Sequence, residues 1–71
     1  MPKRTELIKK IEQAAQANGI AFTFKRRGGN HDVYNLDGLM IPVERHRELT
    51  NQYAEKVYRE CQPKLGRGWW R

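Results

Sequence analysis

The chain has 71 residues, of which 14 are lysine or arginine and 8 are aspartate or glutamate, so its formal net charge is +6. This length suits one small domain and excludes a deep interior pocket for a large organic cofactor. The positive charge favours a polyanionic partner, either nucleic acid or an acidic protein. The single cysteine, Cys61, excludes an intramolecular disulfide and a cysteine zinc site. We expect a protein of the reducing cytoplasm without a membrane span, because no apolar run approaches about 20 residues.

The first predicted element is an amphipathic helix over residues 5–17. Its apolar side chains recur at helical spacing along one face, and they are Leu7, Ile8, Ile11, Ala14 and Ala15. We expect Thr5 to cap the beginning of this helix. Asn18 and Gly19 predict its end, because a left-handed residue commonly follows the last helical turn.

A strand is predicted directly after this helix, within residues 20–26. Its large apolar residues, Ile20, Phe22 and Phe24, alternate with smaller or polar ones, which is typical of a strand with one buried face. Residues 27–30 predict a turn, because glycine and asparagine accept positive φ angles at low cost.

Two further strands complete an antiparallel meander, at residues 31–36 and 39–42. The Asp37–Gly38 pair between them predicts a tight hairpin. We expect the third strand to end at Pro42, because proline cannot donate a hydrogen bond to a neighbouring strand.

A second helix is predicted after a charged connection, with Thr50 or Asn51 as its cap. Its buried stripe contains Ala54, Val57, Tyr58 and Cys61. Pro63 is expected to end it. We therefore divide the chain into a folded domain over residues 1–62 and a C-terminal tail over 63–71, which has no periodicity and is expected to be mobile or to contact a partner.

The predicted fold class is α+β, with the order α-β-β-β-α. The apolar stripes of both helices need cover, and one face of the three-stranded antiparallel sheet can cover both. The opposite face of the sheet is then available to a partner.

The stretch KRRGGNH, residues 25–31, is the strongest candidate for a functional site. Histidine can act as acid or base near neutral pH, and cleavage of RNA without a metal needs such groups for the 2′-hydroxyl and the leaving 5′-oxygen. The candidate phosphate-binding groups beside His31 are Lys25, Arg26, Arg27, Gly28, Gly29 and Asn30. From the spacing alone, a surface histidine beside a solvated basic turn remains an alternative.

The run GNHDVY, from Gly29 to Tyr34, resembles the Gly-Ser-His-x-x-aromatic motif of the HicA family of toxins, which are small mRNA interferases of type II toxin–antitoxin pairs. LIKKIEQA and NGIAFTFKRRGGNH resemble that family's opening helix, first strand and loop, and YAEKVYREC resembles its closing helix. MIP followed by RHREL resembles its Ile-Pro-x-His-x-Glu-Leu segment. The likeness covers about residues 5–62, with Asn30 in place of serine and three residues rather than one between Pro42 and His46.

This resemblance implies a fold like that of double-stranded-RNA-binding domains. It also implies a metal-independent endoribonuclease with His31 as the catalytic residue, no metal or organic cofactor, mRNA as substrate and a HicB-type antitoxin as partner. Two other functions remain open, namely a noncatalytic RNA-binding module of the same fold and a basic domain that binds an acidic protein.

Several residues outside this stretch have two readings. Arg45 and Arg47 can extend the cationic surface beside His31, or form surface ion pairs with Glu44 and Glu48. His46 can bind phosphate, act with His31 as an acid–base pair, or be a solvated group of the connection. For the adjacent indoles, Trp69 and Trp70, the alternatives are stacking on bases, contact with an antitoxin, and folding back on the body.

Overall fold

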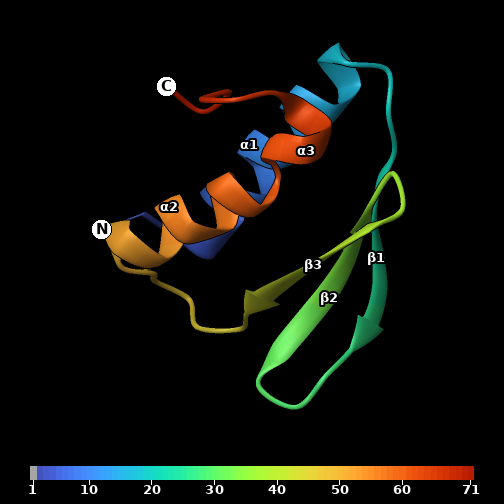
Figure 1. Ribbon diagram of the computed structural model, residues 1–71. Helices are drawn as coiled ribbons and strands as arrows, with labels where there is room; N and C mark the ends of the chain where they lie inside the picture. Colours follow the sequence, from blue (N-terminus) through green and yellow to red (C-terminus); the bar gives the residue numbers. More distant parts are fainter. Residues whose placement is uncertain (1) are drawn as a thin grey trace.

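A computed structural model describes residues 2–71 (Figure 1). The elements in chain order are α1 (Arg4–Ala17), β1 (Phe22–Arg27), β2 (His31–Leu36), β3 (Leu39–Glu44), α2 (Asn51–Glu60) and α3 (Gln62–Leu65). The strands form one antiparallel sheet in the order β1-β2-β3. The helices cover one face of this sheet, which confirms the predicted α-β-β-β-α layout.

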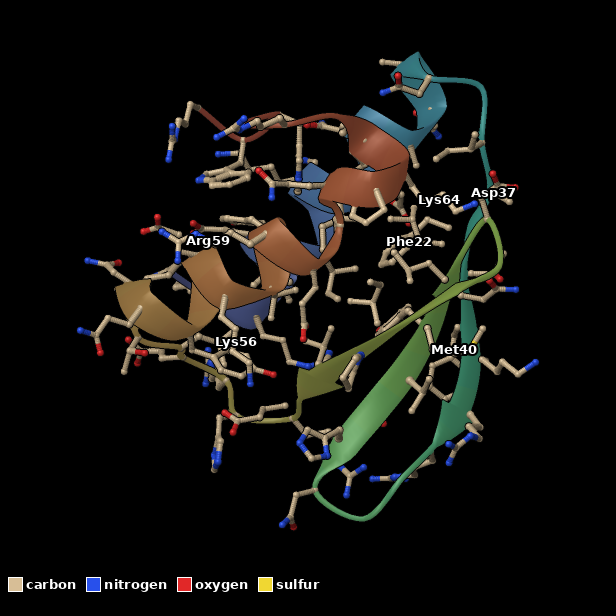
Figure 2. The ribbon with its side chains drawn as sticks, viewed as in Figure 1. Phe22, Asp37, Met40, Lys56, Arg59 and Lys64 are labelled. Carbon is tan, nitrogen blue, oxygen red and sulfur yellow. The ribbon has the colours of Figure 1, made fainter. Side chains whose placement is uncertain are left out.

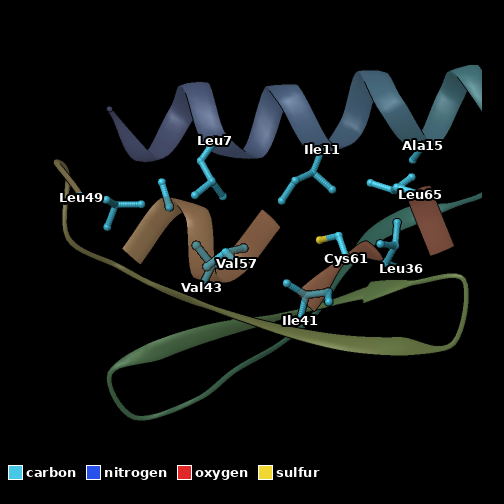
Figure 3. Packing of buried hydrophobic residues seen from close by; sticks show 11 residues of the cluster. Leu7, Ile11, Ala15, Leu36, Ile41, Val43, Leu49, Val57, Cys61 and Leu65 are labelled. Atoms are coloured by element: carbon cyan, nitrogen blue, oxygen red, sulfur yellow. The ribbon is translucent and has the colours of Figure 1, made fainter. Parts of the chain in front are cut away.

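The core lies between the helices and the sheet (Figure 3). Its largest fully buried side chains are Leu7 and Ile11 of α1, Leu36, Ile41 and Val43 of the sheet, and Val57 and Cys61 of the C-terminal helical region. The predicted apolar stripes of both helices are thus confirmed. Burial raises the pKa of the Cys61 thiol to about 12, so this residue is a packing group and not a nucleophile near neutral pH.

The beginning of α1 differs from the prediction that Thr5 caps it, which is wrong. The N-cap is Lys3, and its side chain makes no capping hydrogen bond. The backbone N–H of Arg4 instead donates to the carbonyl of Arg47 (2.9 Å), since Lys3 pairs with Glu48 in an isolated bridge. A contact distant in sequence therefore replaces the local cap. The other end is as predicted, with Gly19 at φ +68° after Asn18.

The third strand also differs from its prediction, because it continues past Pro42 to Glu44. β3 is an edge strand, and the backbone N–H of Glu44 faces away from β2 to donate to the hydroxyl of Tyr53 (3.0 Å). The nitrogen of Pro42, two residues earlier, faces the same outer side, so its missing N–H costs no ladder hydrogen bond. The hairpin before it is confirmed, with Asp37 at φ +50° and Gly38 at φ +95°.

The first strand has less burial than its alternation predicts. Phe24 is 56% exposed, and no residue of β1 belongs to the buried core. Phe22 stacks on Tyr34 with ring centroids 5.0 Å apart, while Phe24 meets the edge of the same ring at 5.7 Å. A register shift between Phe24 and Arg26 then interrupts the alternation, leaving Lys25 as the extra residue of a bulge.

Helix α2 begins at the predicted cap, since the Thr50 side chain accepts a hydrogen bond from the N–H of Tyr53 (3.0 Å). Pro63 lies inside the short α3, beyond the last residue of α2. The ammonium of Lys64 in α3 lies 3.6 Å from the Asp37 carboxylate at the hairpin. Both side chains are labelled in Figure 2.

The C-terminal tail, for which the sequence predicts mobility or a partner contact, folds back on α2. The Trp69 indole N–H donates to the carbonyl of Tyr58 (2.7 Å), and the two rings meet edge to face at 5.2 Å. The ring centroids of Trp70 and Tyr58 are 6.1 Å apart. Leu65, before the two indoles, is buried. Of the alternatives for the two indoles, folding back on the body is the one observed. Among residues 2–71, no helix has the length and apolar character needed to cross a membrane.

Candidate functional site

His31 is exposed at the first position of β2. Strand alternation directs Asp32, Tyr34 and Leu36 towards the helices, so His31 and Val33 point to the opposite face of the sheet. Tyr34 is thus on the other face from His31, as expected, and packs on Phe22. Within residues 2–71 the His31 imidazole forms no hydrogen bond, so both ring nitrogens can meet a ligand.

The turn before His31 closes through its backbone. The N–H of Gly28 donates to the carbonyl of His31 (2.7 Å), and a Cβ added at Gly28 would lie 2.9 Å from that same oxygen. Glycine is therefore required here by close approach. At Gly29 an added Cβ would meet nothing within 4 Å. The predicted backbone N–H donors therefore differ in availability. The N–H of Gly28 is used inside the turn, whereas those of Gly29 and Asn30 have no acceptor in the described part of the chain.

The side chain of Arg45 forms hydrogen bonds to this turn on the side of Asp32. Its guanidinium donates to the carbonyls of Gly28 (2.9 Å), His31 (3.2 Å) and Gly29, and to the Asp32 carboxylate (3.2 Å). Its backbone N–H also points to the carbonyl of Asn30, at 3.4 Å. The side chain is 32% exposed. Its Nη1 and Nη2 groups thus bind the loop and Asp32, and the RNA contact that the sequence predicts for Arg45 stays a prediction.

Asp32 links this turn to the beginning of α1. One carboxylate oxygen accepts from Arg45 and the other from Arg4 (2.8 Å), and the carboxylate side chain is only 15% exposed. Arg4 also donates to the carbonyl of Glu44 (2.8 Å) and lies 3.5 Å from the hydroxyl of Tyr34. The sequence reasoning missed this network. A signal was present, since Asp32 occupies a core-facing position of a strand, where a carboxylate needs partners.

The three cations of β1 remain exposed, and none forms an ion pair within residues 2–71. Their directions differ, however. Arg26 pairs with Val33 and therefore shares the face of His31, whereas Arg27 pairs with Asp32 and lies on the other face. Lys25 occupies the bulge. The register thus distributes these candidate phosphate-binding cations around the edge of the sheet.

The remaining predicted residues lie across from the turn. Glu44 is directly opposite His31 in the register, so a carboxylate enters the site that the sequence reasoning did not place there. His46 and Arg47 are both exposed in the connection after β3. No side-chain ion pair joins Arg47 to either neighbouring glutamate in the described structure. Across residues 2–71, no group of three histidine, cysteine or acidic side chains is arranged to hold a metal ion.

No described protein family, no curated protein and no solved structure matches this chain significantly. The functional inference therefore depends on the residues and geometry of the site and on the sequence resemblance described above.

Proposed function

We propose that this protein is a metal-independent endoribonuclease of the HicA type, the toxin of a type II toxin–antitoxin pair. The observation that carries the proposal is the exposed imidazole of His31 beside a turn that Arg45 binds by hydrogen bonds, with an unpaired Arg26 on the same face. The net charge of +6 supports a polyanionic substrate.

The reaction needs two proton transfers and no redox step. The 2′-hydroxyl loses its proton to a base, its oxygen forms a bond to the adjacent phosphorus, and the bond from phosphorus to the 5′-oxygen breaks as that oxygen gains a proton. His31 performs one of these transfers. In this proposal Arg26 and the unpaired N–H groups of Gly29 and Asn30 stabilise the charge that develops on the phosphoryl oxygens, which their exposure and lack of protein partners support.

The proposed regulator is a HicB-type antitoxin that covers the sheet face bearing His31. This face is opposite the helices, so a partner can occupy it without disturbing the core. Because the toxin is strongly basic, we expect an acidic antitoxin surface and a complex that weakens as salt concentration rises.

One observation favours a second function, a noncatalytic RNA-binding module of the same fold. No protein group accepts or donates a hydrogen bond to the His31 ring within residues 2–71, so nothing fixes its tautomer or orientation before a ligand arrives. In this alternative His31 contacts a phosphate or a 2′-hydroxyl and transfers no proton.

The deciding experiment compares cleavage of a defined transcript, in EDTA, by the wild-type protein and by His31→Ala. We expect 2′,3′-cyclic phosphate ends from the wild type and at least about a 100-fold lower rate from His31→Ala, the usual scale of general acid–base catalysis. Met40→Ala is the matched control, because Met40 is 42% exposed at the far end of the same sheet face. Circular dichroism checks that all three proteins are folded.

An intact transcript with the wild type would contradict the nuclease proposal. RNA retention by that protein would then support the binding module, and the absence of retention would support a basic domain that binds an acidic protein.

A further inference from the structure

A polar hollow of about 270 Å³ lies next to His31. It is lined by Asn30, Glu44, Arg45 and His46. Two of these residues adjoin His31 directly, since Asn30 precedes it in the chain and Glu44 is opposite it in the β2–β3 register. The hollow therefore belongs to the same end of the sheet as the candidate catalytic histidine.

The hollow brings His46 to this end of the sheet. His46 is exposed in the connection two residues after the end of β3. The preceding residue, Arg45, keeps the connection close to the turn, because its N–H points to the carbonyl of Asn30 (3.4 Å) and its side chain donates to Asp32. His46 lines the hollow directly, and His31 adjoins it through Asn30 and Glu44.

Glu44 is opposite His31 in the register and lines the hollow with His46. Its N–H donates to the hydroxyl of Tyr53 (3.0 Å), and its carbonyl accepts from Arg4 (2.8 Å). The backbone of Glu44 is therefore held by α2 and α1 as well as by the sheet. A carboxylate so placed can accept a hydrogen bond from an imidazole N–H and orient that ring.

We propose that His46 is the second proton-transfer group of the nuclease, with the scissile phosphate held between the two imidazoles. One imidazole takes the proton of the 2′-hydroxyl as the new bond to phosphorus forms. The other gives its proton to the 5′-oxygen as the bond from phosphorus to that oxygen breaks. Each ring ends the step in the opposite protonation state, so the pair is restored by one proton exchange with water. This proposal rests on the nuclease function proposed above.

The test uses an RNA oligonucleotide whose scissile 5′-oxygen, mapped first with the wild type, is replaced by sulfur. A thiolate leaves without protonation, so this substrate removes the need for a general acid. His31→Ala and His46→Ala are compared on the oxygen and sulfur substrates, with Gln52→Ala, at an exposed residue of α2, as the control. Binding of each variant to the same RNA carrying a 2′-deoxy scissile nucleotide separates lost chemistry from lost affinity.

We expect both histidine variants to cleave the oxygen substrate at least about 100-fold more slowly than the wild type while retaining their binding. The sulfur substrate should restore cleavage in only one of them, which identifies the acid, and the other is then the base. Cleavage by His46→Ala within about threefold of the wild type, with His31→Ala inactive, would overturn the role of His46 and leave the nuclease function standing. Recovery of both variants, or of neither, would also overturn the division of roles. An inactive wild type would refute the nuclease itself.

Discussion

Two groups of cations flank the turn at residues 28–30, and the structure treats them in opposite ways. Behind the turn, Arg4 and Arg45 are part-buried, with side chains 19% and 32% exposed, and their donors are used by Asp32 and by backbone carbonyls. By contrast, Arg26, on the face of His31, and Arg27, on the helix-facing side, are exposed and have no acidic partner in the described residues. The same residue type therefore holds the site in one place and remains available to a ligand in the other.

This difference shows what decides the role of an arginine in a small basic protein. A guanidinium has five donors in a planar fork, so it becomes structural wherever several acceptors converge. The turn offers Arg45 three carbonyls and a carboxylate, whereas β1 at the sheet edge offers Arg26 only an apolar cross-strand neighbour, Val33. The result is a turn bound by the hydrogen bonds of Arg45, with the exposed Arg26 on the face of His31, and such preorganisation reduces the ordering cost of binding an anion.

Replacing Arg45 should have the largest effect on folding. Arg45→Ala leaves the loop carbonyls without their donor and Asp32 with one partner in place of two, so we expect a loss of about 2–3 kcal/mol in the free energy of unfolding, below the value for a fully buried pair. Arg45→Lys should recover only part of it, because a single ammonium cannot reach the same acceptors. Urea denaturation measures each value.

Arg47→Ala is the control, since Arg47 is an exposed arginine of the same connection. It should change the free energy of unfolding by no more than about 0.5 kcal/mol. Equal stability of the Arg45→Ala and Arg47→Ala variants would show that Arg45 does not hold the turn.

Replacement of the two glycines of the turn should change the free energy of unfolding less than replacement of Arg45. Gly28→Ala should cost about 1–2 kcal/mol in unfolding free energy, because the new Cβ would lie 2.9 Å from the His31 carbonyl and the backbone would have to move. Gly29→Ala should be neutral within about 0.5 kcal/mol, since its Cβ meets nothing within 4 Å. Thermal and urea unfolding of both variants test this difference. Equal losses would mean that the turn is not closed as described.

The elements that were predicted correctly are those set by local pattern. The apolar stripe of α1, the Thr50 cap and the Asp37–Gly38 hairpin each depend on residues within a few positions of one another. The two errors at element ends have the opposite character. The prediction that Thr5 caps α1 was wrong because the carbonyl of Arg47 accepts from the N–H of Arg4 in the first turn. The prediction that the third strand ends at Pro42 was wrong because β3 is an edge strand.

The site follows the same division. Its residue types were recognisable in the sequence, because a histidine, glycines and cations are adjacent in the chain. The partners of each cation were not recognisable in the sequence, because Arg4 binds Asp32 28 positions away and Arg45 binds Gly28 17 positions away. Such interactions depend on how the sheet is closed against α1, and no local spacing encodes them. The bulge at Lys25 likewise changed which cations share the face of His31.

The exposed cations should affect folding least and RNA binding most. In a His31→Ala background, the combined replacement of Lys25, Arg26 and Arg27 by alanine should leave the free energy of unfolding within about 0.5 kcal/mol per site. The dependence of log affinity for single-stranded RNA on log salt should become shallower by up to about 0.7 for each phosphate that the variant no longer neutralises. Fluorescence anisotropy of a labelled oligonucleotide across a salt series measures this slope.

A control with the same change in net charge replaces Lys56, Arg59 and Lys64, which lie on the helices, by alanine. If the β1 cations bind phosphate, this control should retain most of the wild-type slope, because charge distant from the RNA is screened within about 10 Å at 0.1 M salt. An equal change of slope in both triple variants would mean that RNA senses only the total charge. The distinction between the part-buried arginines that bind the turn and Asp32 and the exposed cations of β1 would then concern stability alone.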